Sequence, residues 1–208
     1  AVADTLHFVG NERDFEEQVS SLQINHQDVS SAKKGDEVGM KVSGPAREGD
    51  RDGQLQVIED FLSRKVDGMV VAPLDESALV PVLERVWKAK VPCAVIDSGV
   101  KTGNILTFVA TDNLQGGALA ARKLVELLGG KGRVLMLQYM SGSASTMARE
   151  RGFVETLEKE GKGIQLLDSK YGLDTVETSL TAAEDLLTRN KGFDGLYAVN
   201  ESTSVGAL

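Results

Sequence analysis

The chain has 208 residues, of which 41% are hydrophobic and 26% charged, and its formal net charge is −8. These values are typical of a globular protein with enough apolar residues for a core. No stretch supplies the roughly 18 consecutive apolar residues of a membrane span. The acidic balance, with no local Lys/Arg stripe, repels a phosphate backbone. The sequence therefore predicts no nucleic-acid partner and no direct membrane insertion.

Residues 1–43 differ in pattern from the rest of the chain. The run Leu6–Val9 predicts a short strand. The stretch Phe15–Leu22 fits two patterns, because its apolar residues have helical spacing and also alternate with polar neighbours. After a turn, Glu37–Val42 alternates as a strand does. We interpret residues 1–43 as an atypical, β-rich segment.

From residue 44 onward, amphipathic stretches alternate with short apolar runs. Such runs are typical of parallel strands that are covered on both faces, and the stretches between them have helical periodicity. The predicted strands are 68–72, 91–96, 133–138, 164–167 and 193–199. The predicted helices are 52–64, 77–88, 114–128, 145–159 and 175–189, with another from Ser202. This order predicts right-handed βαβ units and doubly wound parallel sheets.

The segment Ile105–Gly117 divides this alternation. Its apolar run stops at Thr111-Asp112-Asn113, and a glycine pair follows. We interpret it as the crossing between two α/β lobes. The predicted organisation is a first lobe at 44–110 and a second lobe at 111–208, after the atypical segment.

Ligands of such sheets bind beyond the carboxyl ends of the strands, so the residues that follow each apolar run are the candidates for a site. There the sequence places Pro73-Leu74-Asp75, Asp97-Ser98, Thr111-Asp112-Asn113, Gln138-Tyr139, Tyr171 and Asn200-Glu201, with Arg149 near the start of a helix. Carboxylates, amides and a guanidinium suit a neutral polyol, because a sugar hydroxyl both donates and accepts.

Catalytic chemistry finds little support. Both histidines, His7 and His26, lie in the atypical segment, and no nucleophile motif stands beside a base. The single cysteine, Cys93, lies within an apolar run and fits a buried side chain. The run Gly129–Gly132 follows a helix and precedes a strand, which is the wrong order for a phosphate loop. We predict no enzymatic activity, no catalytic residue, no cofactor and no metal.

Several consecutive motifs resemble those of the ribose-type sugar-binding proteins of bacterial ABC importers. The resemblance covers about residues 44–208. The motifs are Val66–Pro73, Val91–Ser98, Phe108–Asn113 with Gln115–Gly117, Gly142–Thr146 with Arg149–Phe153, and Ala198–Glu201.

This resemblance implies an α/β fold with two doubly wound parallel-sheet lobes of periplasmic-binding-protein type, incomplete at its carboxyl end. It implies a protein that binds a monosaccharide between its lobes and delivers it to the membrane permease subunits of an ABC importer. The location implied is periplasmic or otherwise extracytoplasmic. Carried over by position, the ligand-binding residues are Asp97, Arg149, Asn200, Asp112 and Tyr171.

Two alternatives remain open at this point. The same architecture serves as the sugar-sensing effector lobe of regulators or receptors, although residues 1–42 hold no helix-turn-helix pattern. Residues 5–42 also resemble part of the second, β-barrel domain of elongation-factor-like proteins. That likeness makes a non-functional chimeric fragment the other alternative.

Overall fold

The computed structural model describes residues 5–10, 13–18, 22–24, 27–31 and 51–208. Its contacts separate the chain into two compact units, residues 1–57 and residues 58–208. The strand predicted at Glu37–Val42 lies outside the described residues.

The amino-terminal unit contains two short antiparallel hairpins. In the first, β1 (Thr5–Gly10) pairs with β2 (Arg13–Gln18), and in the second, β3 (Leu22–Ile24) pairs with β4 (Gln27–Val29). The strand predicted at Leu6–Val9 is confirmed. Of the two patterns that overlap β2, the strand is the one observed, because pairing with β1 satisfies its backbone groups.

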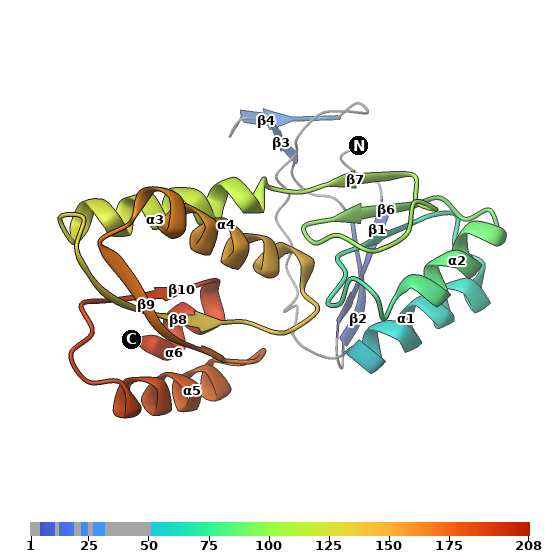
Figure 1. Cartoon of the computed structure of the whole chain (residues 1–208). Helices are drawn as coiled ribbons and strands as arrows, with labels where there is room; N and C mark the ends of the chain where they lie inside the picture. Colours follow the sequence, from blue (N-terminus) through green and yellow to red (C-terminus); the bar gives the residue numbers. More distant parts are fainter. Residues whose placement is uncertain (1–4, 11–12, 19–21, 25–26, 32–50) are drawn as a thin grey trace. The chain divides into compact units, whose positions relative to one another are not determined.

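The first parallel sheet has the order β5-β6-β7. Figure 1 shows helices α1 and α2 beside this sheet. The elements are α1 (Arg51–Arg64), β5 (Met69–Val71), α2 (Val80–Lys88), β6 (Cys93–Ile96) and β7 (Thr107–Val109). The predicted helix start at Ser77 is wrong, because Asp75 Oδ1 accepts hydrogen bonds from the N–H groups of Ser77 and Ala78 and forms a turn there.

In strands β5 and β6 of the first sheet, one face is buried and the other is not. Met69, Val71, Cys93 and Val95 are at most 7% exposed, and so are Ile58 and Phe61 of α1. On the other face, Val70, Ile96 and Val109 are between 40% and 54% exposed. The alternation along these short strands thus separates a packed apolar face from an exposed one.

The second parallel sheet has the order β10-β8-β9, with β8 in the centre. Its elements are α3 (Asn113–Leu127), β8 (Gly132–Gln138), α4 (Ala144–Glu160), β9 (Ile164–Tyr171), α5 (Val176–Arg189), β10 (Gly195–Ala198) and α6 (Glu201–Ala207). The chain winds outward from β8 in both directions. Strand β9 is four residues longer than predicted, because its polar second half pairs with the end of β8.

Helices cover both faces of the second sheet (Figure 1). On one face, Val134 and Met136 of β8 pack against Ala121 of α3 and against Phe153 of α4. On the other face, Leu135 and Leu137 pack with residues of α5. All four β8 side chains are at most 4% exposed. This is the pattern of a central parallel strand, and it explains the continuous apolar run in the sequence.

Among the described residues, no helix is both long and apolar enough to cross a membrane.

Candidate ligand-binding site

Arg149 lies in the second turn of α4, and contacts from two other segments fix its guanidinium. Its Nε donates to Asn113 Oδ1 at 2.7 Å, and its Nη1 donates to the carbonyl oxygen of Val199 at 3.1 Å. A guanidinium carries further N–H donors in a rigid fork. Those of Arg149 have no protein partner among the residues that the structure describes. The side chain is thus both held in place and available to a ligand.

Two glycines bring the backbone of α4 close to α3. A Cβ at Gly117 would lie 1.9 Å from the carbonyl oxygen of Arg149, and a Cβ at Gly152 would lie 2.0 Å from that of Leu114. No real side chain tolerates such distances. Gly117 and Gly152 therefore allow a close contact between α3 and α4, and this contact sets the position of Arg149.

At the crossing between the sheets, the amide of Asn113 contacts Arg149 and the carboxylate of Asp112 does not. Asn113 is 8% exposed, and its Nδ2 donates to the carbonyl oxygen of Thr111 at 3.1 Å. Asp112 is exposed and caps α3, with Oδ1 accepting from the N–H of Gln115 at 3.0 Å. Asn113 was part of the sequence motif, but nothing in the sequence distinguished it from Asp112.

Asp97 follows β6 in a strained turn. Its φ is +61°, and the N–H of Ser98 donates to the carbonyl oxygen of Ile96 at 2.6 Å. A three-residue turn with positive φ is the rare, costly kind. The carboxylate is exposed and has no partner within the described part of the chain. This backbone therefore presents an unpaired acceptor at the end of the strand.

The turn after β6 contacts the start of α4. Ser98 is 3% exposed, and its Oγ accepts a hydrogen bond from the N–H of Ser145 at 3.2 Å. The N-cap residue Ser143 makes no side-chain cap of its own. Beside this contact, the N–H of Glu76 donates to the carbonyl oxygen of Gly142 at 2.8 Å. The first sheet thus supplies a hydrogen-bond acceptor to the amino end of α4.

Asn200 is the N-cap of α6 and follows β10. Its Oδ1 accepts hydrogen bonds from the N–H and the hydroxyl of Thr203 at 3.2 and 2.8 Å. Its Nδ2 has no partner among the residues described. The helix therefore uses the oxygen and leaves the amide nitrogen as the group that can donate to a ligand.

Tyr171 ends β9 opposite Gln138 of β8 and is 43% exposed. Gln138 Nε2 donates to Glu150 Oε2 at 2.9 Å. Glu150 is 7% exposed, and burial raises the pKa of its carboxyl, against the opposing effect of hydrogen bonds from Gln138 and the Tyr139 N–H. Burial also raises the pKa of Tyr197 to about 12.

The first two turns of α4 connect the neighbourhoods of all five predicted site residues. Arg149 lies there itself, Ser145 contacts the residue after Asp97, and Arg149 contacts the residues beside Asp112 and Asn200. Tyr171 is linked through Gln138 and Glu150. Glu150 and Tyr197 were missed as candidates, because one lies in a charged helical stretch and the other inside an apolar run.

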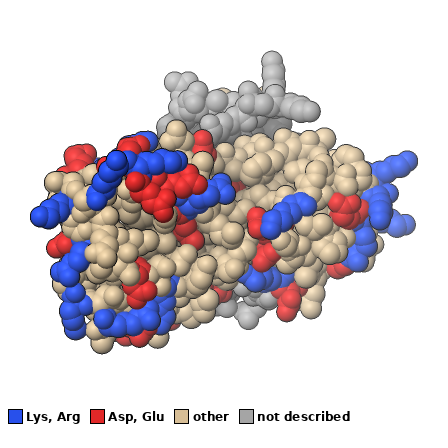
Figure 2. Space-filling model, viewed as in Figure 1, with Lys and Arg blue, Asp and Glu red and all other residues tan. Residues whose placement is uncertain are grey.

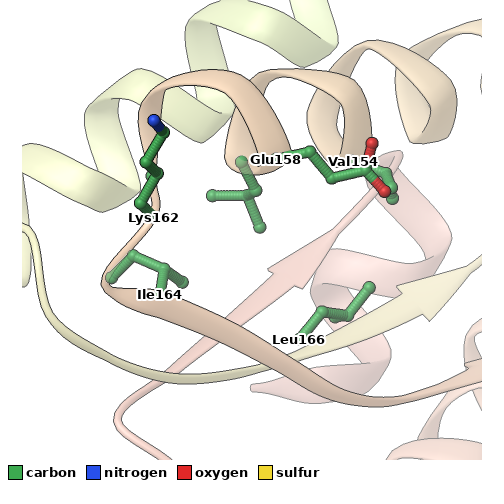
Figure 3. A pocket seen from close by; sticks show the side chains of 7 residues that line it. Val154, Glu158, Lys162, Ile164 and Leu166 are labelled. Atoms are coloured by element: carbon green, nitrogen blue, oxygen red, sulfur yellow. The ribbon is translucent and has the colours of Figure 1, made fainter.

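The structure also has an open hollow of about 500 Å³ at the other end of α4. Val154, Glu158, Lys162, Ile164 and Leu166 line it (Figure 3). These residues belong to the carboxyl-terminal half of α4, the short connection that contains Lys162, and the first part of β9. Ligands of parallel sheets bind at the opposite, carboxyl ends of the strands. The hollow therefore contains none of the candidate residues.

Charge on the described surface is mixed. In Figure 2, basic side chains occur in small groups beside acidic ones. Several of them form exposed ion pairs, such as Arg122 with Glu160 at 2.8 Å. Within the described ranges, no cluster of His, Cys, Asp and Glu has the arrangement of a metal site. The candidate residues Asp97, Arg149 and Asn200 are hydrogen-bonding groups of the kind that suit a neutral, polar ligand.

Known proteins are similar to this chain in sequence and in fold. The chain is 30% identical over 205 residues to a ribose import binding protein of Bacillus subtilis, covering 96% of this chain and 66% of that protein. It is 28% identical over 177 residues to a D-allose-binding periplasmic protein of Escherichia coli, covering 81% and 57%. The chain thus spans 57% to 66% of the length of these two relatives.

Solved structures agree with this likeness. The periplasmic component of an ABC-type sugar transport system from Hahella chejuensis superposes with a TM-score of 0.74 at 32% identity, covering 78% of this chain and 60% of that one. An ABC transporter solute binding protein from Agrobacterium vitis with bound D-fucose gives 0.73 at 32% identity, covering 79% and 57%. The α/β fold is therefore of the periplasmic-binding-protein type. Residues 26–208 match the family described as periplasmic binding protein domain, and the chain belongs to that family.

Proposed function

We propose that this chain is the sugar-binding part of a solute-binding protein that delivers a monosaccharide to an ABC importer. The observation that carries the proposal is the anchored guanidinium of Arg149, whose remaining donors have no protein partner among the described residues. A donor that is already fixed loses little entropy when a ligand binds, which favours affinity. The names of the relatives support a sugar as the ligand.

Each candidate residue has a chemical role in this proposal. Asp97 accepts hydrogen bonds from sugar hydroxyls, and Arg149 donates to ring or hydroxyl oxygens. Asn200 donates through Nδ2, because α6 occupies its Oδ1. Asp112 lies at the crossing between the lobes, and the exposed ring of Tyr171 is available as an aromatic wall for the sugar.

The proposal extends to the organisation and setting of the protein. The separate sheets support a first lobe at 44–110 and a second lobe at 111–208. The family supports an extracytoplasmic location, ABC permease subunits as the partner, and ligand binding without catalysis. The likeness of residues 5–42 to an elongation-factor β-barrel stays a prediction.

A thermal-shift screen with D-ribose, D-allose and D-fucose tests the proposal. A ligand at about 100 times its Kd stabilises the native state by about 2.7 kcal/mol, which is a readily measured rise in Tm. Arg149→Ala should weaken binding by roughly 10- to 100-fold, since it removes hydrogen bonds from a charged donor.

The matched control is Arg151→Ala on the same helix. Arg151 is exposed and its ion pair with Glu155 is loose, with 3.9 Å between Nε and Oε1. The Arg151→Ala variant should bind sugar with the same affinity as the unmodified chain. The proposal fails if no sugar raises the Tm, or if both arginine variants bind with unchanged affinity.

A further inference from the structure

Glu150 is a buried acid whose hydrogen bonding is incomplete. Its side chain lies on α4, beside Arg149, and the residue is 7% exposed. Oε2 accepts a hydrogen bond from Gln138 Nε2 at 2.9 Å, and the backbone N–H of Tyr139 also donates to the carboxyl. Oε1 is buried and has no hydrogen-bond partner among the residues that the structure describes. Glu150 thus holds the last residue of β8 and the residue that follows it.

The unpartnered oxygen bears on the protonation state. An ionised carboxylate in such a place would bury a charged oxygen that accepts from no donor in the described part of the chain, which is costly. The neutral acid carries a proton on one oxygen and still accepts from Gln138 on the other. The geometry therefore favours the neutral form.

The other ionisable groups around Glu150 do not offset a negative charge. Arg149 precedes it on α4, Tyr139 follows β8, Tyr171 pairs with the Gln138 that donates to Glu150, and Tyr197 of β10 interacts electrostatically with both Arg149 and Glu150. Arg149 is the only cation among them, and its guanidinium donates to Asn113 Oδ1 and to the carbonyl oxygen of Val199. The α3 residue in this region is the amide Asn113. No described neighbour makes an ion pair with Glu150.

We propose that Glu150 is a positioning residue which, in its neutral form, holds the carboxyl end of β8 beside Arg149, so that ligand affinity depends on its proton. This inference rests on the proposed sugar-binding function and adds a regulation to it. An ionised Glu150 carboxylate is stabilised by moving toward water or another donor. That movement breaks its hydrogen bonds with Gln138 and Tyr139 and changes the position of the carboxyl end of β8, which the ligand contacts.

The direction of the pH dependence follows from the raised pKa. Because the folded state binds this proton more tightly than the unfolded state, the contribution of Glu150 to stability is complete below the ordinary pKa of 4.5. It is lost as the pH rises through the folded-state pKa. Ligand affinity falls over the same range.

Two measurements on the ligand-free protein test the neutral form. The Tm difference between E150Q and the unmodified chain should grow by about 3 °C from pH 5 to pH 8, since the amide cannot ionise. Carbon-13 NMR of labelled Glu carboxyls should show one resonance, absent in E150Q, that titrates above 4.5. The control E158Q changes an exposed Glu on the same helix and should show a constant Tm difference.

The ligand arm uses calorimetric titration with D-ribose at each pH. The Kd of the unmodified chain and of E158Q should rise about tenfold between pH 5.5 and pH 8, whereas that of E150Q should change less than about twofold. A pH-independent Kd in the unmodified chain overturns the inference. So does a Glu150 carboxyl that titrates at or below its ordinary value.

A failure of the proposed function looks different from a failure of this inference. If no sugar binds at any pH, the sugar-binding proposal falls with the ligand coupling, although the ligand-free Tm and NMR results still report the state of Glu150. If D-ribose binds and those two ligand-free signals are absent, the function stands and the inference falls.

Discussion

The two parallel sheets have three described strands each but differ in how helices cover them. In the second sheet, α3 and α4 cover one face of β8 and α5 covers the other. In the first sheet, one face is buried and Val70, Ile96 and Val109 on the other are 40% to 54% exposed. The second sheet is thus the more completely packed of the two, and we expect it to hold the candidate site in place while the loops after the strands of the first sheet contribute to it.

The largest expected effect is a loss of stability when a buried phenylalanine is removed, compared between the second-sheet region and the first-sheet region. Phe153 is fully buried and stacks on Tyr197, with ring centroids 4.1 Å apart. Phe61 is 7% exposed and belongs to α1. Phe153→Ala should cost about 4 kcal/mol of unfolding free energy and Phe61→Ala about 3 kcal/mol. Urea unfolding measures both, and equal or reversed costs would contradict the proposed difference between the sheets.

The single cysteine reports the opening of the first sheet. Cys93 lies in β6 and is 2% exposed, and burial raises the pKa of its thiol from 9.0 to about 11. At pH 8 this shift alone lowers the thiolate fraction by about 100-fold. A thiol-specific reagent should thus label the native chain at least that much more slowly than the urea-unfolded chain. Labelling that proceeds before β8 amides exchange would show that the first sheet opens separately. Equal rates in the native and unfolded chains would disprove the burial of Cys93.

The helix contact of the second half gives the next effect. Gly117→Ala places a methyl group 1.9 Å from the carbonyl oxygen of Arg149, so we expect a loss of about 2 kcal/mol and weaker sugar binding. Gly116→Ala is the matched control, because nothing lies within 4 Å of its Cβ. That change should stabilise the helix by about 0.5–1 kcal/mol. Similar stabilities for both variants, measured by urea unfolding, would show that α3 and α4 are not in close contact.

The smallest effect concerns one of the hydrogen bonds between the first-sheet region and the amino end of α4. Ser98→Ala removes the acceptor of the Ser145 N–H and should cost about 1 kcal/mol, in the range of a lost helix cap. Ser63→Ala is the control, since its hydroxyl is exposed and bonds only within α1. Thermal unfolding of both variants provides the measurement. If the Ser98 variant is as stable as the Ser63 variant, the Ser98–Ser145 hydrogen bond does not contribute to stability.

Much of the fold was predictable because its signals are local. The apolar run of β8 is continuous because both of its faces are buried, and the glycines after α3 adopt positive φ values of +63° and +78°. The ends of elements were less predictable. The turn capped by Asp75 replaced the first residues of a predicted helix, and β9 extended into polar residues through pairing. Both depend on which backbone partners are available.

The candidate site shows the same limit. The sequence identified Arg149 and the strand-end residues through their order along the chain. It did not indicate that Asn113, rather than Asp112, contacts Arg149, or that Glu150 is buried and bonded to the last residue of β8. Two adjacent polar residues in a helix or loop look equivalent in the sequence pattern. Only the direction of each side chain in the folded protein decides which one caps a helix and which one contacts Arg149.

The sequence by itself determined the α/β class, the alternation of the elements and the family, because periodicity and consecutive motifs follow from the order of side chains. The tertiary structure decided which polar atoms are occupied and which are available to a ligand. It placed Ser98 at the amino end of α4 and left one oxygen of Glu150 without a partner in the described ranges. The physical reason is that hydrogen bonds and desolvation depend on distances between segments far apart along the chain, and those distances exist only after packing.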